Sequence, residues 1–146
     1  MLAIGMLVPF ASSFADVPGA HPAYLHARTD LRRSERLMDM REEPNVTRDL
    51  AAAAHEVREA IREIDAAARW DRKDIEDHPP VDTYPDRPGR FRAIAQFLFA
   101  ARRDIDREED NPGARAWRNR ALHHIDESIR LVRRAARADW RDDWVR

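Results

Sequence analysis

The chain has 146 residues, which is enough for one domain with its own hydrophobic core. Charged residues make up 36% of the chain, yet its formal net charge is only −1, so positive and negative side chains are mixed. This balance gives no overall field that would favour nucleic acid as a partner. The absence of cysteine excludes disulfides, thiolate metal sites, c-type haem attachment and cysteine-based catalysis.

The first fifteen residues form an uncharged, apolar stretch that ends in Ser13-Phe14-Ala15. A short apolar run followed by small residues is typical of a secretory signal peptide. We therefore expect residues 1–15 to be removed and residues 16–146 to form one exported domain, in the periplasm of a bacterium. The stretch lacks the basic residue usual at the start of a signal, so an uncleaved membrane anchor is the alternative. Its apolar run is shorter than the roughly 20 residues that a spanning helix needs.

Four amphipathic helices are predicted from the spacing of apolar residues between prolines. In each of four segments, apolar side chains recur every three or four residues. The expected helices span residues 23–43, 47–74, 88–109 and 112–139. Four helices of similar length with mostly short connections favour an all-α fold, an antiparallel up-down-up-down four-helix bundle. No transmembrane segment is expected in the mature chain, because charges recur every few residues.

The second and fourth predicted helices resemble each other at an offset of 68 residues. His55-Glu56-Val57-Arg58 aligns with His123-His124-Ile125-Asp126, and the similarity continues toward the end of both segments. A duplicated helical hairpin would explain this pattern. Two helices rich in arginine, alanine and glutamate that align by composition alone would explain it equally well.

Several short motifs are spread along the mature chain. They are His21-Pro22-Ala23-Tyr24-Leu25-His26-Ala27 with Asp30-Leu31-Arg32, Lys73-Asp74, Asp77-His78-Pro79-Pro80-Val81-Asp82, Glu108-Glu109-Asp110-Asn111 and His124-Ile125-Asp126-Glu127. Together they resemble an uncharacterised family of small exported bacterial helical-bundle proteins. The resemblance implies a periplasmic helical domain and implies no activity, cofactor or catalytic residue.

Two histidine–glutamate pairs are candidates for metal binding. His55 with Glu59 and His123 with Glu127 are each four residues apart, which places both members on one face of a helix. Together with His78 they could bind Zn, Cu or Ni. Both pairs lie roughly opposite the apolar stripes of their helices, so solvated faces are the alternative, and no cofactor is expected in that case.

The segment between the second and third helices concentrates acidic residues near two prolines. Asp74, Asp77 and His78 are candidates for binding a partner or a divalent cation. The alternative is structural, because Asp77 or His78 could tie the segment to a neighbouring helix end.

The C-terminal segment combines arginines with two tryptophans. Trp140 and Trp144 are four residues apart and share a face of a continued helix, where they could cover the bundle end or anchor a partner or membrane interface. The arginines of this segment could bind anionic lipid headgroups or form a solvated face. They are Arg118, Arg130, Arg133, Arg134, Arg137 and Arg141.

No nucleophile motif accompanies the histidines, so we expect no catalysis. The sequence favours a small exported bundle with a binding, chaperone-like or structural role. Its partner would be an envelope protein or a second copy of the chain in a homodimer. A periplasmic metal-binding bundle is the alternative.

Overall fold

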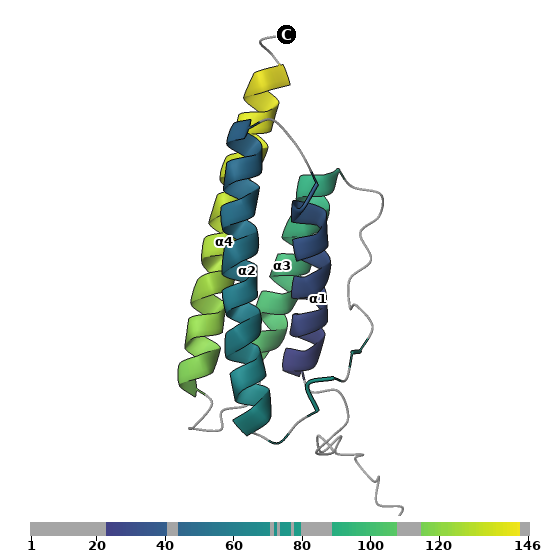
Figure 1. The fold of residues 1–146 in the computed structure, drawn as a ribbon, viewed down its shortest axis with the longest axis vertical. Coiled ribbons are helices and arrows are strands. Elements are labelled where there is room, and N and C mark those ends of the chain that lie inside the picture. Colours follow the sequence, from purple (N-terminus) through teal and green to yellow (C-terminus); the bar gives the residue numbers. More distant parts are fainter. Residues whose placement is uncertain are drawn as a thin grey trace, which may run out of the picture.

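The structure is a computed structural model that describes residues 23–40, 44–70, 72, 74–76, 78–79, 89–107 and 115–143. Four helices contain nearly all of these residues: α1 (Ala23–Met38), α2 (Pro44–Trp70), α3 (Arg90–Arg107) and α4 (Arg115–Asp143). The helices lie side by side (Figure 1), and the described residues contain no strand. The expected all-α four-helix bundle is thus confirmed. None of the described helices is long and apolar enough to cross a membrane.

The core forms because each helix turns one apolar face inward. The most extensively packed pair is α2 with α4, followed by α1 with α3. In the first pair, Val57 of α2 and Ile125 of α4 have no exposed surface. Small residues such as Ala53, Ala60 and Ala121 are also buried, which lets the two helix backbones approach closely.

The helix ends differ from the expected bounds for identifiable reasons. Helix α2 begins at Pro44 rather than near residue 47, because proline fits the first helical position, where no backbone N–H is needed. The same helix ends at Trp70 rather than near residue 74. There the N–H of Arg72 donates to the carbonyl of Arg69 over 3.1 Å, and Arg72 adopts a left-handed conformation with φ of 56°.

The order of helix directions corrects the up-down-up-down expectation. Arg90, at the start of α3, donates to the carbonyl of Met40 just after α1, so α3 begins at the end of the bundle where α1 ends. Arg134 of α4 pairs with Asp49, near the start of α2, so these two helices are antiparallel. The chain therefore runs up, down, down and up, with α2 and α3 parallel and every packed pair antiparallel (Figure 1). The long connection of residues 71–89 permits this order, because it can cover the length of a helix.

The two helical hairpins, α1–α2 and α3–α4, are arranged almost as two halves of a symmetric pair. Helix α1 packs on α3, and α2 packs on α4. Glu56 and His124, which occupy the same position of the 68-residue sequence repeat, contact each other directly. Contact between equivalent positions is expected at a two-fold axis, but any antiparallel helix pair has such a local axis, so the hairpin duplication stays a prediction.

Candidate functional site

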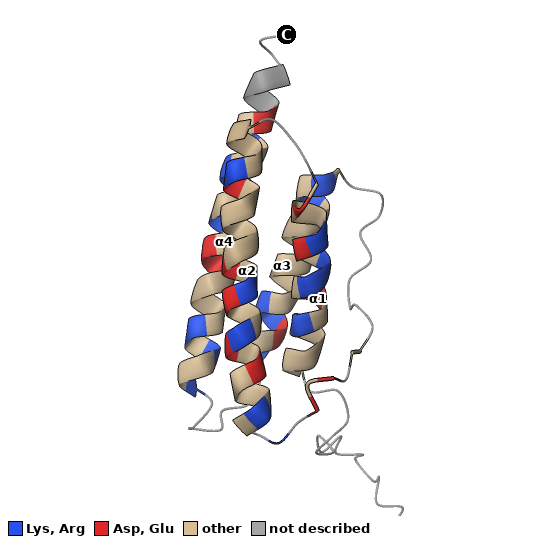
Figure 2. Cartoon of the chain, in the orientation of Figure 1, with Lys and Arg blue, Asp and Glu red and all other residues tan. Residues whose placement is uncertain are grey.

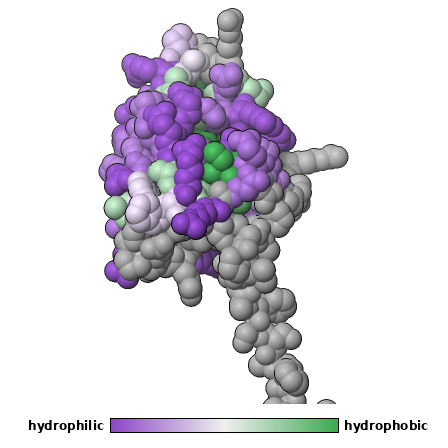
Figure 3. Space-filling view, turned by 60° about the horizontal axis from the view of Figure 1, so that its bottom comes forward, coloured by the Kyte–Doolittle hydropathy of each residue, from purple (hydrophilic) through white to green (hydrophobic). Residues whose placement is uncertain are grey.

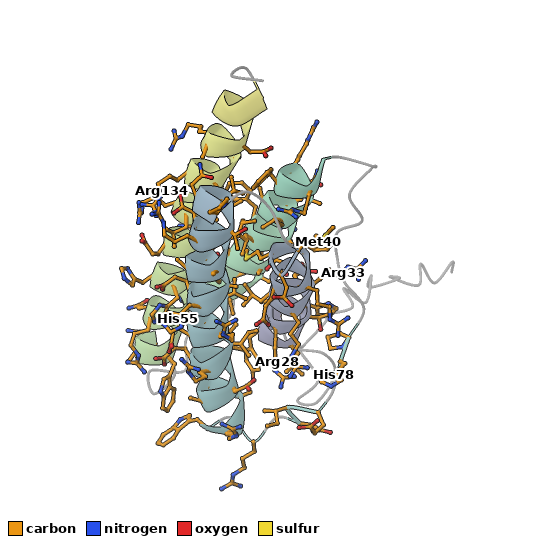
Figure 4. The ribbon with its side chains drawn as sticks, turned by 45° about the horizontal axis from the view of Figure 1, so that its top comes forward. Arg28, Arg33, Met40, His55, His78 and Arg134 are labelled. Atoms are coloured by element: carbon orange, nitrogen blue, oxygen red, sulfur yellow. The ribbon has the colours of Figure 1, made fainter. Side chains whose placement is uncertain are left out.

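The two histidine–glutamate pairs lie on the outer face of the α2–α4 layer, where Figure 4 shows His55 directed away from the core. His55 Nε2 is 3.5 Å from Glu59 Oε1, and the His55 side chain is 59% exposed. Glu59 also binds Arg62. No group of three or more histidine, aspartate or glutamate side chains that could hold a metal occurs among the residues the structure describes. The metal site therefore stays a prediction.

In the second pair, Glu127 is already bound by an arginine. Arg130 binds both carboxylate oxygens of Glu127, and this hydrogen bonding lowers the pKa of Glu127 below its usual value. The His123 ring lies edge-on to His124, with ring centroids 5.7 Å apart. A metal at His123 and Glu127 would have to displace Arg130 from the carboxylate.

A ladder of charged pairs joins α2 to α4. Its three acidic residues, Asp49, Glu56 and Glu63, are spaced by seven residues, which is two turns of helix. Asp49 binds Arg134 through two contacts of 2.7 Å, and Glu63 binds Arg120 at 2.9 and 2.8 Å. The central pair is Glu56 with His124, whose Oε2 and Nδ1 are 2.7 Å apart. The ladder fixes how α2 and α4 are paired, which is a structural role.

The segment after α2 is tied to α1 by a buried arginine. The Arg28 side chain is only 4% exposed and its Nε lies 2.6 Å from Asp65 Oδ1. Its Nη1 donates to the Ile75 carbonyl over 2.6 Å and lies 3.4 Å from His78 Nδ1. Figure 4 shows Arg28 and His78 close to each other. Arg32 approaches the same nitrogen at 3.3 Å. His78 thus lies beside two arginines within α1, whereas the structural alternative placed this contact at a helix end.

The other candidates of this segment and of the C-terminus are only partly described. Asp74 Oδ1 accepts a hydrogen bond from the N–H of Glu76 over 2.9 Å, which shapes the local turn. Asp77 and Trp144 lie outside the described residues. Trp140 belongs to α4, but the structure does not describe its side chain.

Two buried carboxylates belong to the α1–α3 layer. Asp30 has no exposed surface and Asp104 is 7% exposed. Each takes part in an interaction with another group. Neither residue lines the two surface grooves described below.

A shallow groove lies between the end of α1 and the first turns of α2. It has a volume of about 320 Å³ and is lined by Met38, Asp39, Met40, Thr47, Ala51, Ala54 and Arg58. Met40 is 54% exposed, whereas Met38 beneath it is 3% exposed. A second groove of about 480 Å³ lies between α2 and α4 and is lined by Asn45, Arg48, Asp49, Arg134 and Ala138. Its arginine Arg134 is already bound by Asp49.

Among the residues the structure describes, large apolar side chains are exposed at three places, of which the sequence pattern indicated only Phe99, beside the apolar stripe of the third helix. They are Met40, Trp70 and Phe99. Trp70, at the end of α2, packs against Trp117 of α4 with ring centroids 5.6 Å apart. The position of Trp70 in the sequence could have predicted its exposure, because Trp70 does not belong to the apolar stripe of its own helix.

Comparison of the chain with protein-family models, with curated proteins and with solved structures finds no match. The function therefore has to be inferred from the site itself.

Proposed function

We propose that this chain is a non-catalytic binding protein of the bacterial envelope, with a chaperone-like or structural role. The observation that carries the proposal is the groove between α1 and α2, with its exposed methionine Met40. Methionine is flexible and polarizable, so a methionine-lined surface can adapt to different apolar side chains. We infer that the groove takes a short segment of a partner protein.

The walls and rim of the groove suit such a segment. Met38, Ala51 and Ala54 give it an apolar floor, while Asp39 and Arg58 place both charges at its edge. Arg58 Nη1 is held 3.0 Å from Glu35 Oε1, so this edge is pre-formed. An apolar centre with a polar rim is the usual anatomy of a protein-binding site. Its volume of about 320 Å³ is near the lower limit of ligand pockets, which suits one or two side chains of a partner.

Export remains part of this proposal. It is supported by the apolar stretch of residues 1–15, which lies outside the described residues. Cell fractionation of the expressed full chain tests it: recovery with the envelope supports export, and recovery with the cytosol overturns it.

Site-specific photo-crosslinking tests the groove. A photoreactive residue replaces Met40 in one variant of the full chain and the exposed Arg92 of α3 in a matched control. We expect the Met40 probe to form a discrete adduct with an envelope protein, and Ala51→Arg, which blocks the groove, to abolish that adduct. Equal labelling from both positions, or an adduct that survives Ala51→Arg, would contradict the proposal. An adduct with a second copy of this chain would identify the partner as the chain itself.

Metal binding is the second candidate function, supported by the contact between His55 and Glu59. Calorimetric titration of the full chain with Zn, Cu or Ni tests it, with a His55→Ala/His123→Ala variant as control. Binding that the double variant loses would favour this candidate, and heats equal to those of the variant would reject it.

A further inference from the structure

One end of the bundle combines exposed tryptophan with exposed arginine. Trp70 is 60% exposed and packs against Trp117 with the two rings tilted by 55°, which joins the last turn of α2 to the first turn of α4. Helix α1 begins at this same end, because Arg28 near its start binds Asp65 near the end of α2. In the sequence, the apolar stretch of residues 1–15 precedes this start of α1.

Three arginines lie within two residues of the tryptophans in the sequence: Arg69 and Arg72 at the end of α2, and Arg115 at the start of α4. All three are exposed, and among the residues the structure describes none of them has an ion-pair partner. Figure 2 shows blue at the lower ends of α2 and α4, whereas the segment beneath α1 carries red. We call Trp70, Trp117, Arg69, Arg72 and Arg115 the basic aromatic end.

The backbone of Arg72, in this basic aromatic end, adopts a conformation that costs free energy. Its φ of 56° is left-handed, a region that an ordinary L-residue enters only at the expense of a steric clash. Glycine is the usual residue at such a position after a helix. An arginine here indicates that its side chain has a use which offsets the strain.

We propose that the basic aromatic end binds the surface of a membrane that contains anionic phospholipid. Tryptophan prefers the boundary between water and lipid, and arginine can place its charge among phosphate groups while its stem covers apolar surface. In Figure 3, with this end turned forward, hydrophilic side chains cover most of the described face around one small hydrophobic patch, which fits attachment rather than insertion. An uncleaved apolar stretch of residues 1–15, which precedes α1 in the sequence, would favour a lipid surface over an acidic protein at this end. The opposite end, with the groove at Met40, would then face away from the membrane.

Vesicle flotation of the full chain tests the proposal. The probe is phosphatidylglycerol–phosphatidylcholine vesicles, with phosphatidylcholine vesicles for comparison. Replacing Arg69, Arg72 and Arg115 by glutamine should weaken binding to the anionic vesicles by about fivefold per arginine, because each basic residue near such a surface contributes on the order of 1 kcal/mol. The matched control replaces three exposed arginines far from this end, Arg33, Arg36 and Arg92, by glutamine. Equal losses in both triple variants, or equal binding to the two kinds of vesicle, would overturn the proposal.

Tryptophan quenching separates this end from the N-terminal stretch, which could hold the chain on vesicles by itself. In a Trp140→Phe/Trp144→Phe background, Trp70 and Trp117 are the remaining tryptophans. Brominated phospholipid in the anionic vesicles should quench them, because the proposal places both rings in the headgroup region. Flotation without quenching would overturn the proposal, since the end would then not contact lipid.

Arg72→Gly separates a membrane role from a merely structural one. Glycine relieves the left-handed strain, so the variant should melt several degrees higher than the parent chain. The same variant should bind the anionic vesicles about fivefold less tightly. A variant that is more stable and binds vesicles unchanged would show that Arg72 has no part in membrane binding.

Discussion

Arg28 shows how one residue connects three parts of the chain. Its guanidinium, buried between α1 and α2, binds Asp65 and the Ile75 carbonyl, and Nη1 lies close to the His78 ring. A buried charge is tolerated only when it is paired, because removing it from water is costly. The contacts therefore stabilise both the helix pair and the beginning of the long connection to α3.

Breaking this pair should strongly destabilise the bundle. In Asp65→Asn the Arg28 charge would stay buried without its counter-ion, so the free energy of unfolding should fall by about 3–5 kcal/mol. Urea unfolding followed by circular dichroism measures it. The matched control is Glu35→Gln, which breaks the exposed pair with Arg58 and should cost at most about 1 kcal/mol. Similar losses in the two variants would contradict the structural role of Arg28.

Asp49 should make stability depend on acid. The hydrogen bonds from Arg134 hold the pKa of the Asp49 carboxyl below its usual value, although burial acts in the opposite direction. A carboxyl whose pKa is lower in the folded state stabilises the fold above the pKa it has when unfolded. That contribution is lost as the pH falls through the folded-state pKa. Melting temperatures measured from neutral to acidic pH should fall less steeply for Asp49→Asn than for the parent chain, and parallel curves would contradict this assignment.

At the scale of the helices, the α2–α4 pair dominates the packing. Ser128 of α4 donates to the Ala53 carbonyl of α2 over 3.1 Å, and the charged ladder runs along the same pair. Small buried residues keep the helices close, and the seven-residue spacing of the acids keeps the ladder in register. The pair therefore acts as the frame on which α1 and α3 pack.

A cavity between α2 and α4 should lower the free energy of unfolding. Ile125 has no exposed surface, so Ile125→Ala should lower the free energy of unfolding by about 2–5 kcal/mol. Leu122→Ala, one turn earlier and only partly buried, is the control and should cost clearly less. Chemical denaturation of both variants measures the difference, and a larger loss for Leu122→Ala would place the centre of the pair elsewhere.

At the scale of the whole molecule, the ring of helices predicts cooperative unfolding. Each helix packs on two others, so the loss of any one helix would expose the apolar faces of two neighbours. Thermal unfolding should therefore give one transition in which tryptophan fluorescence, which includes Trp70 and Trp117, coincides with the loss of helix. Separate transitions would indicate that the α2–α4 pair survives the loss of α1 and α3.

Repeating the melt with Zn, Cu or Ni also tests the metal-binding candidate, because a ligand at 100 times its dissociation constant adds about 2.7 kcal/mol to the free energy of unfolding.

The two proposed binding surfaces lie at opposite ends of the bundle. The groove at Met40 lies where α1 ends, while the basic aromatic end lies where α1 begins. A bundle attached at one end could present its groove at the other end to a partner. Each task has its own test, so either can fail without the other.

The sequence by itself determined the helices and the side that each helix buries. Leu31, Val57, Leu98 and Ile125 belong to predicted apolar stripes and are all buried, because the 3.6-residue period alone fixes which side chains share a face. The helical pairing of His55 with Glu59 followed from spacing in the same way.

Only the tertiary structure decided the order of helix directions, the burial of Arg28 and the meeting of Trp70 with Trp117. Each depends on which helices become neighbours, and the long connection of residues 71–89 is compatible with more than one order. Local periodicity carries no information about that choice, because it describes a helix relative to its own axis. Contacts across helices, such as Arg28 with Asp65, arise only once the whole bundle has assembled.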